Sequence, residues 1–434
     1  MNQLLLKKAA IQSVALMFMV LFFSYALEHY HSVTILAKGN ILLDTNIDTI
    51  SAALNQAISE TTDSSERQSV LSAGNQQQEI LSYSSTEEFK ENIDKDILDQ
   101  LGERYLIIKK PTGIHISYQI EDLYLLKSIR FTLKGEGLGI VNEDMITRVH
   151  EGKIYRGMPQ DQEMTTMQEV PSTEVAYKEA DNDIVSSVQI ERLEKDKTGS
   201  ESVSMLIGMD HVYVQNIYED DNYYYINLRN PKVAYDKVIV IDPGHGGKDA
   251  GAISIRDGVY EKEINLLISL QLKKILDKSD IKVYYTRLGD DKVFLKPRIG
   301  LANDVDSDFY ISIHNNACPE EWPHGTEILY YDNEVKGIKN KNMADIFSEE
   351  LGKAISLEPQ GTVEKHDDDV FVLNHSEVPS VLIEVGYLTN RHDMNYLSQE
   401  SNQEAVAEGI YNGIMRLYKE YKFPDRQSSI RDWQ

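Results

Sequence analysis

Four side chains that lie far apart along the chain are of the types that a hydrolytic metal site uses. They are His245, Glu261, His314 and Glu384. Two histidines and a carboxylate are a common ligand set of catalytic zinc, which keeps a further position open for water. A carboxylate that does not bind the metal can take a proton from water and give it to a leaving amine. The four residues therefore suffice for metal-assisted hydrolysis of an amide, although their types alone do not assign the roles.

Each of these residues lies at or near the end of a predicted element. His245 and His314 each follow a short apolar strand, and Glu384 lies within a third. The carboxyl ends of parallel strands meet at one edge of an open sheet, where ligand sites form. Glu261 begins a predicted helix, where a carboxylate suits the helix dipole and can face the same crevice. We therefore expect the four side chains to converge.

The second half of the chain alternates apolar strands with segments of helical periodicity. This pattern is typical of an α/β domain with a twisted, mostly parallel or mixed sheet flanked by helices. The predicted strands are Val238–Ile241, Lys282–Thr286, Phe309–Ile313, Glu327–Tyr331 and Val381–Val385, and the predicted helices are Glu261–Asp277, Lys296–Asp304, Lys341–Ile355 and Gln403–Tyr421.

The residues alone leave other interpretations open. The glycine-rich segment Asp242–Gly247 can form a plain turn or a loop that cradles phosphate. It lacks, however, the Lys-Ser/Thr ending of a P-loop and the spacing of a dinucleotide-binding loop. A single histidine after a strand is often a surface or capping residue. Glu384 is the hardest to explain in this way, because a carboxylate within an apolar strand is costly to bury unless it is paired or liganded.

Six segments, in this order, resemble the catalytic domain of the zinc-dependent N-acetylmuramoyl-L-alanine amidases of the family 3 type. The resemblance covers about residues 237–417. Six blocks in the same order are far more specific than any one of them. The blocks are Ile241–Gly247, Glu261–Leu266, Thr286–Arg287, Arg298 with Ala302–Asn303, Ser312–Ala317 and Pro379–Asn390.

The resemblance implies a role for each of the four residues. His245, Glu261 and His314 would bind zinc, and Glu384 would be the catalytic carboxylate. The implied substrate is peptidoglycan, and the implied bond is the amide between N-acetylmuramic acid and L-alanine. Two alternatives remain open: a wall-binding module without activity, and a zinc peptidase that acts on the stem peptide.

The chain departs from the family pattern at three positions, none of them a proposed ligand. Asn315 stands where the family often has Ala, Asn374 where it commonly has Arg, and Tyr387 where it has Phe. For Asp242, we expect either that it orients His245 or that it caps the loop. The remaining histidines with no clear partner in the sequence are expected to be surface or loop residues: His324, His366, His375 and His392.

Composition narrows the classes of partner. The formal net charge of -26 repels nucleic-acid phosphates, so nucleic acid is not an expected partner. Cys318 is the only cysteine, which excludes an intrachain disulfide and a cysteine-rich zinc site.

The N-terminus predicts export. Lys7 and Lys8 precede an uncharged, mostly apolar run, Ala9–Leu27, whose length is near the minimum for a membrane span. Lysines on this side keep the N-terminus inside, so we expect a single-pass membrane anchor with the catalytic domain outside. The alternative is a cleaved signal peptide with Ser24–Ala26 as the cleavage motif and secretion to the cell wall.

These patterns divide the chain into five parts. The β-rich part either binds wall polymer or serves as a spacer, and its sequence does not decide between the two. Amidases of this type are often held in check, so a regulatory protein is a further candidate partner, which the sequence does not identify. The parts are 1–30 (anchor or signal peptide), 31–100 (polar spacer), 101–232 (β-rich, with an acidic loop at 160–202), 233–421 (catalytic) and 422–434 (flexible tail).

Overall fold

The computed structural model describes most of the chain from residue 93 to residue 421. The gaps within that range are 112–115, 151–152, 156–182, 194, 196–198, 255–257 and 367–368. The predicted anchor or signal peptide, the predicted spacer up to residue 92 and the predicted tail at 422–434 lie outside the described residues. Within the described part, no helix is both long and apolar enough to cross a membrane.

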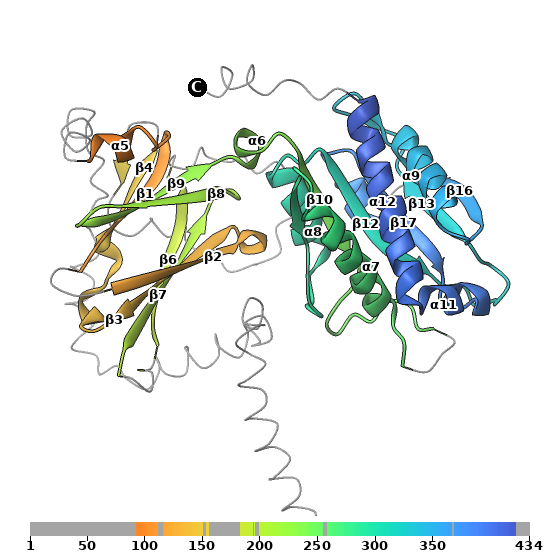
Figure 1. Cartoon of the computed structure of the whole chain (residues 1–434), viewed down its shortest axis with the longest axis horizontal. Coiled ribbons are helices and arrows are strands. Elements are labelled where there is room, and N and C mark those ends of the chain that lie inside the picture. Colours follow the sequence, from red (N-terminus) through yellow and green to blue (C-terminus); the bar gives the residue numbers. More distant parts are fainter. Residues whose placement is uncertain are drawn as a thin grey trace, which may run out of the picture. The chain divides into compact units, whose positions relative to one another are not determined.

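The first described part is a β-sandwich. One antiparallel sheet has the order β5-β4-β1-β9-β8 and the other the order β2-β3-β7-β6 (Figure 1). Leu106 and Ile226 of the first sheet share a core with Phe131 and Met205 of the second. The strands are β1 (Arg104–Lys109), β2 (Ile116–Leu123), β3 (Ser128–Gly135), β4 (Ile146–His150), β5 (Lys153–Tyr155), β6 (Val185–Leu193), β7 (Glu201–Met209), β8 (Val214–Glu219) and β9 (Tyr223–Arg229); helix α5 (Lys95–Leu98) precedes them and α6 (Pro231–Ala234) follows.

One prediction for this part needs correction. The interval 160–202, predicted as an acidic loop, contains strand β6 and the first residues of β7. Strand β6 is at the edge of its sheet and exposes many of its side chains, so its polar composition conceals it. Tyr124–Leu126 forms a 3-10 turn, and Lys127 follows with φ 46°, so that β2 and β3 pair as a hairpin.

A six-stranded mixed sheet forms the centre of the second part, with the order β11-β10-β12-β17-β13-β16. Strands β11, β10, β12 and β17 run parallel to one another, whereas β13 is antiparallel to β17. The start of β13 therefore lies at the edge where β12 and β17 end. The strands are β10 (Val238–Pro243), β11 (Lys282–Tyr285), β12 (Phe309–Asn316), β13 (Thr326–Tyr330), β16 (Pro359–Glu364) and β17 (Ser380–Tyr387); β14 (Glu334–Val335) and β15 (Ile338–Lys339) form a separate small hairpin.

Helices cover this sheet on both faces, as the buried strands require. Helices α7 (Glu261–Leu276), α9 (Asn340–Ala354) and α12 (Glu400–Glu420) lie side by side over one face (Figure 1). Ile239 and Ile241 of β10 pack with these helices, whereas Val238 and Val240 point to the core beneath α8 (Leu295–Asp304). The period-2 alternation of a strand places successive residues on opposite faces.

The predicted α/β architecture is confirmed, since every strand and helix predicted for this part is present. Strand β16 and the short helices α10 (Phe371–Asn374) and α11 (Arg391–Leu397) were not predicted. Strand β16 begins with proline, contains a glycine and is an edge strand with much of its surface exposed. Such a segment has no apolar alternation to reveal it.

Candidate metal centre

The loop after β10 carries His245 in an unusual backbone conformation. His245 has φ 60°, in the left-handed region that residues other than glycine rarely adopt. The preceding Gly244 leaves space for the second histidine, since a Cβ at this position would lie 2.2 Å from the ring of His314. The ring centroids of the two histidines are 4.8 Å apart. A strained turn and a glycine thus allow the two imidazoles to approach each other.

Two buried arginines hold this loop by its carbonyl groups. Arg298 donates to the backbone oxygens of Pro243 (2.8 Å) and His245 (2.6 Å). Arg287 donates to the backbone oxygens of Pro243 (2.9 Å) and Gly244 (2.8 Å). Because both guanidinium groups are planar and multiply bonded, they hold the turn in one geometry.

Asp242 provides the countercharge beneath the loop. Its carboxylate accepts hydrogen bonds from Arg298 (2.6 Å), Thr286 (2.5 Å), Tyr310 (2.5 Å) and Ser312 (2.8 Å). Burial raises the pKa of this carboxyl, but Arg298 and the hydroxyl donors outweigh burial and hold the pKa well below its usual range. Of the two roles expected for Asp242, the structure shows contacts that anchor the loop through Arg298.

Glu261, the first residue of α7, lies between the two imidazoles. Its side chain is 5% exposed. One carboxylate oxygen lies 3.0 Å from Nε2 of His245, and the other lies 2.8 Å from Nδ1 of His314. The backbone N–H of Ala252 and the side-chain amide of Asn265 also donate to Glu261, at 2.8 and 3.1 Å. A single buried carboxylate thereby joins the loop after β10, the end of β12 and the start of α7.

These contacts bring three of the four predicted site residues together. His245, Glu261 and His314 each offer a ligand atom, and these atoms lie within 4.8 Å of one another. Burial raises the pKa of Glu261, but the hydrogen bonds from both histidines outweigh it and keep the pKa far below its usual range. Burial opposes the charged form of His245, yet Glu261 and Asp249 raise its pKa to about 9. A negative pocket that attracts protons in this way is also suited to a cation.

Glu384, the fourth predicted residue, lies on the strand beside His314. The two residues are direct partners in the parallel pair β12–β17, so their side chains project from the same face. One oxygen of Glu384, Oε2, is buried without a hydrogen-bond partner. Burial raises the pKa of this carboxyl to about 7, which makes the group able to accept and release a proton near neutral pH.

Three further side chains at the site were not singled out from the sequence. Asp249 has a carboxylate oxygen 3.0 Å from Nδ1 of His245, and Asn265 donates to Glu261. Glu327 is the antiparallel partner of Glu384 on β13. Glu327, like Glu384, is a carboxylate within an otherwise apolar strand, and this was the signal available in the sequence.

The four histidines that were expected to be surface or loop residues lie outside this group. His324 has its two ring nitrogens near the carbonyl of Trp322 and a carboxylate oxygen of Glu358, each at 3.0 Å. His375 stacks on Phe371. The remaining two are exposed beside carboxylates, His366 near Glu364 and His392 near Asp393.

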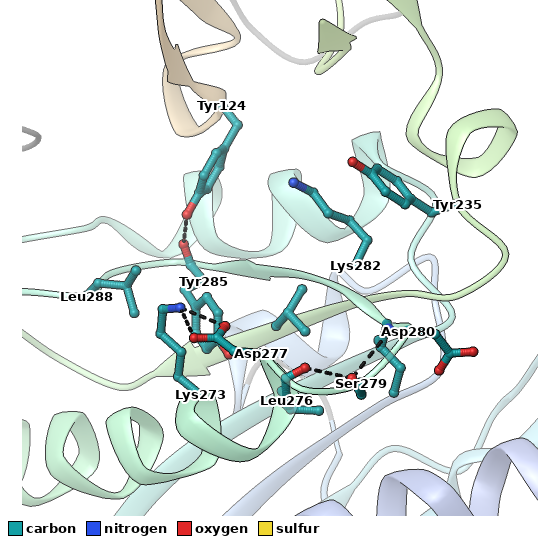
Figure 2. Close-up of a pocket in the computed structure, with 12 residues that line it drawn as sticks. Tyr124, Tyr235, Lys273, Leu276, Asp277, Ser279, Asp280, Lys282, Tyr285 and Leu288 are labelled. Atoms are coloured by element: carbon teal, nitrogen blue, oxygen red, sulfur yellow. Dashed lines mark hydrogen bonds and ion pairs between the residues drawn. The ribbon is translucent and has the colours of Figure 1, made fainter. Parts of the chain in front are cut away.

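A separate hollow of about 510 Å³ runs along edge strand β11, and Figure 2 shows its lining. Tyr124 donates a hydrogen bond to the backbone oxygen of Tyr285, and Lys273 pairs with Asp277. None of the four predicted site residues lines this hollow. The candidate metal centre is therefore a distinct feature at the carboxyl edge of the sheet.

An α/β fold whose sheet edge joins two histidines and a buried glutamate, beside a second glutamate, defines a class of metal-site proteins suited to hydrolysis. Comparison with known proteins gives the family. Residues 239–416 match the family model described as N-acetylmuramoyl-L-alanine amidase. The chain belongs to this family.

Two relatives and one solved structure are named as N-acetylmuramoyl-L-alanine amidases. The chain is 30% identical over 198 residues to the germination-specific N-acetylmuramoyl-L-alanine amidase of Bacillus subtilis (strain 168), across 42% of this chain and 81% of the relative. It is 32% identical over 192 residues to the N-acetylmuramoyl-L-alanine amidase LytC of the same organism, across 44% of this chain but only 37% of LytC. A solved structure of the catalytic domain of CwlV, an N-acetylmuramoyl-L-alanine amidase from Bacillus (Paenibacillus) polymyxa var. colistinus, is 34% identical, covers 43% of this chain and 99% of that chain, and has a TM-score of 0.39.

The buried pair of Asp242 and Arg298 generates a prediction about stability. The substitution Asp242→Asn should lower the free energy of unfolding by about 3–5 kcal/mol, because it leaves Arg298 buried without a countercharge. Urea denaturation followed by circular dichroism measures this change. The matched control is Asp280→Asn, whose ion pair with Lys237 is exposed and should matter by less than about 1 kcal/mol. Equal losses in the two variants would contradict the assigned role of the buried pair.

Proposed function

We propose that this chain hydrolyses the amide bond between N-acetylmuramic acid and L-alanine in peptidoglycan, with zinc as its metal. The observation that carries the proposal is the convergence of His245, Glu261 and His314, with Glu384 on the adjacent strand. The family to which the chain belongs supports the substrate, because its model and named relatives are N-acetylmuramoyl-L-alanine amidases.

The residues present fit a zinc ion on chemical grounds. Two imidazole nitrogens and one carboxylate oxygen are a donor set that catalytic zinc sites use, and such sites leave a position open. Glu261 is tied to both histidines, and its buried charge needs a cation nearby when the histidines are neutral. Asn265 and the N–H of Ala252 orient this carboxylate, as hydrogen bonds around a metal site generally orient its ligands.

Glu384 has the position and proton affinity of a general base. Zinc in such a site supplies a Lewis acid that polarises a carbonyl group and makes water more acidic. Glu384 accepts the proton of the attacking water and delivers it to the departing L-alanine nitrogen, because its raised pKa lets it hold a proton between the two steps. The unpartnered Oε2 is free to make the hydrogen bonds that these transfers need.

The role of Glu384 predicts a loss of turnover without a loss of metal. The substitution Glu384→Gln should lower kcat by about 10²–10⁴-fold, since the amide cannot take up the proton. Mass spectrometry of digested peptidoglycan measures release of peptides with a free L-alanine amino terminus, and elemental analysis measures bound zinc. Glu364→Gln, an exposed carboxylate of β16, is the matched control. Normal activity in Glu384→Gln would refute the role, and cleavage within the peptide would favour a peptidase instead.

The ligand set predicts how the metal affects stability. Zinc should raise the melting temperature of the wild-type chain, since a ligand that binds only the folded state stabilises it by mass action. His314→Ala should lose this zinc-dependent rise because one of the three donors is gone, whereas His375→Ala should keep it. Differential scanning calorimetry with and without zinc and chelator gives the comparison. An undiminished rise in His314→Ala would exclude His314 as a ligand.

We further propose that the chain acts outside the cytoplasm and is held at the cell membrane by the uncharged run Ala9–Leu27. The substrate, a component of the cell wall, agrees with this location. Fractionation of cells that produce the full chain should recover it with the membranes, with its N-terminus intact by mass spectrometry. Recovery from the medium with a shortened N-terminus would show a cleaved signal peptide instead.

A further inference from the structure

Three site residues form a row across three adjacent strands. His314 on β12 is the direct partner of Glu384 on β17, and Glu384 is the direct partner of Glu327 on β13. Partnered residues project from the same face of a sheet, so the row runs outward from the metal centre. Glu327 is therefore the next side chain beyond the proposed general base.

The carboxylate of Glu327 is held in place from two sides. Tyr387 donates its hydroxyl to one oxygen at 3.2 Å, and Asn316 donates its side-chain amide to the other at 3.2 Å. Glu327 is half-buried, so it keeps access to solvent.

Two like charges directly opposite each other are destabilising in a sheet. Glu327 and Glu384 occupy such positions, and one oxygen of Glu384 is buried without a partner. This pair of carboxylates can therefore accept further hydrogen bonds, which a bound molecule can donate. A carboxylate accepts hydrogen bonds and donates none when ionised, so the groups that bind here are N–H or O–H donors.

We propose that Glu327 is a substrate-positioning residue, which accepts a hydrogen bond from a peptide N–H group on the leaving-group side of the scissile amide. This inference rests on the proposed amidase function. The scissile nitrogen must lie beside Glu384 to receive its proton. Glu327 lies on the strand next to that of Glu384, and adjacent strands are about 4.8 Å apart. An extended peptide advances about 3.3–3.6 Å per residue. The N–H that follows L-alanine thus falls within reach of the Glu327 side chain.

The inference defines a substrate class. The site should favour muramoyl peptides with at least two residues over muramoyl-L-alanine, because only the former contain the second N–H group. A hydrogen bond to a charged acceptor changes affinity by roughly tenfold or more.

Binding to a catalytically inactive form tests the inference without relying on turnover. Isothermal titration calorimetry on zinc-loaded Glu384→Gln should show that muramoyl dipeptide binds about tenfold or more tightly than muramoyl-L-alanine. The double variant Glu384→Gln/Glu327→Ala should lose this preference. Glu384→Gln/Tyr387→Phe should weaken it, because Glu327 loses one of its two holding contacts. Glu384→Gln/Glu364→Gln should keep it.

Kinetics on the otherwise wild-type chain separate positioning from structural damage. Glu327→Ala should raise KM for the dipeptide substrate by about tenfold with kcat nearly unchanged, and should leave muramoyl-L-alanine unaffected. The zinc content of Glu327→Ala should equal that of the wild type. Equal losses for the two substrates, or no loss for either, would overturn the inference. A wild-type chain that binds both ligands but releases no L-alanine amino terminus would instead overturn the proposed function.

Discussion

A single buried carboxylate between two imidazoles is the interaction on which the site depends. Glu261 contacts His245 and His314 with its two oxygens, and it comes from a helix rather than from either histidine's own segment. Burying an ionised carboxylate is costly unless it is paired and hydrogen-bonded. The loop, the end of β12 and the start of α7 must therefore keep their positions together, because a displacement of any one leaves that charge without partners.

A second buried charge pair, Arg298 with Asp242, holds the loop that carries His245. Arg298 is neutralised by Asp242 and extends past it to the carbonyl of His245. Arg287 is buried and donates to backbone carbonyl groups, and burial together with the nearby charge of Arg298 lowers its pKa to about 10. Replacing such groups by apolar side chains is often neutral or stabilising in other proteins. Their presence here is explained by the carbonyls that they hold, since the left-handed turn at His245 leaves these oxygens inside the domain.

The sequence was sufficient for the α/β architecture and for the expectation that four distant side chains gather at one edge of the sheet. Fully buried strands such as Val238–Ile241 are visible in the sequence as apolar runs. The rule that ligand sites form where parallel strands end then groups the residues that follow these strands. The rule failed for Glu327 because β13 runs antiparallel, so its start and not its end lies at the site edge. Strand direction depends on contacts between distant segments, and local periodicity carries no information about it. Asp249 was missed for a different reason. Its position depends on the conformation of the glycine-rich turn, which hydrophobic periodicity in the sequence does not predict.

Two of the three departures from the family pattern place hydrogen-bonding groups around the site. The side chain of Asn315 donates to Asn265 at 2.7 Å, and Asn265 in turn donates to Glu261. Tyr387 donates to Glu327 at 3.2 Å, whereas Asn374 is the last residue of helix α10. Hydrogen-bond chains of this kind restrict the orientation of each member more than any single contact does. The departures therefore add support behind the carboxylates and alter none of the proposed ligands. Variation of this kind changes how firmly the side chains are held and which substrate groups they meet, while the donor set that a metal ion requires stays the same.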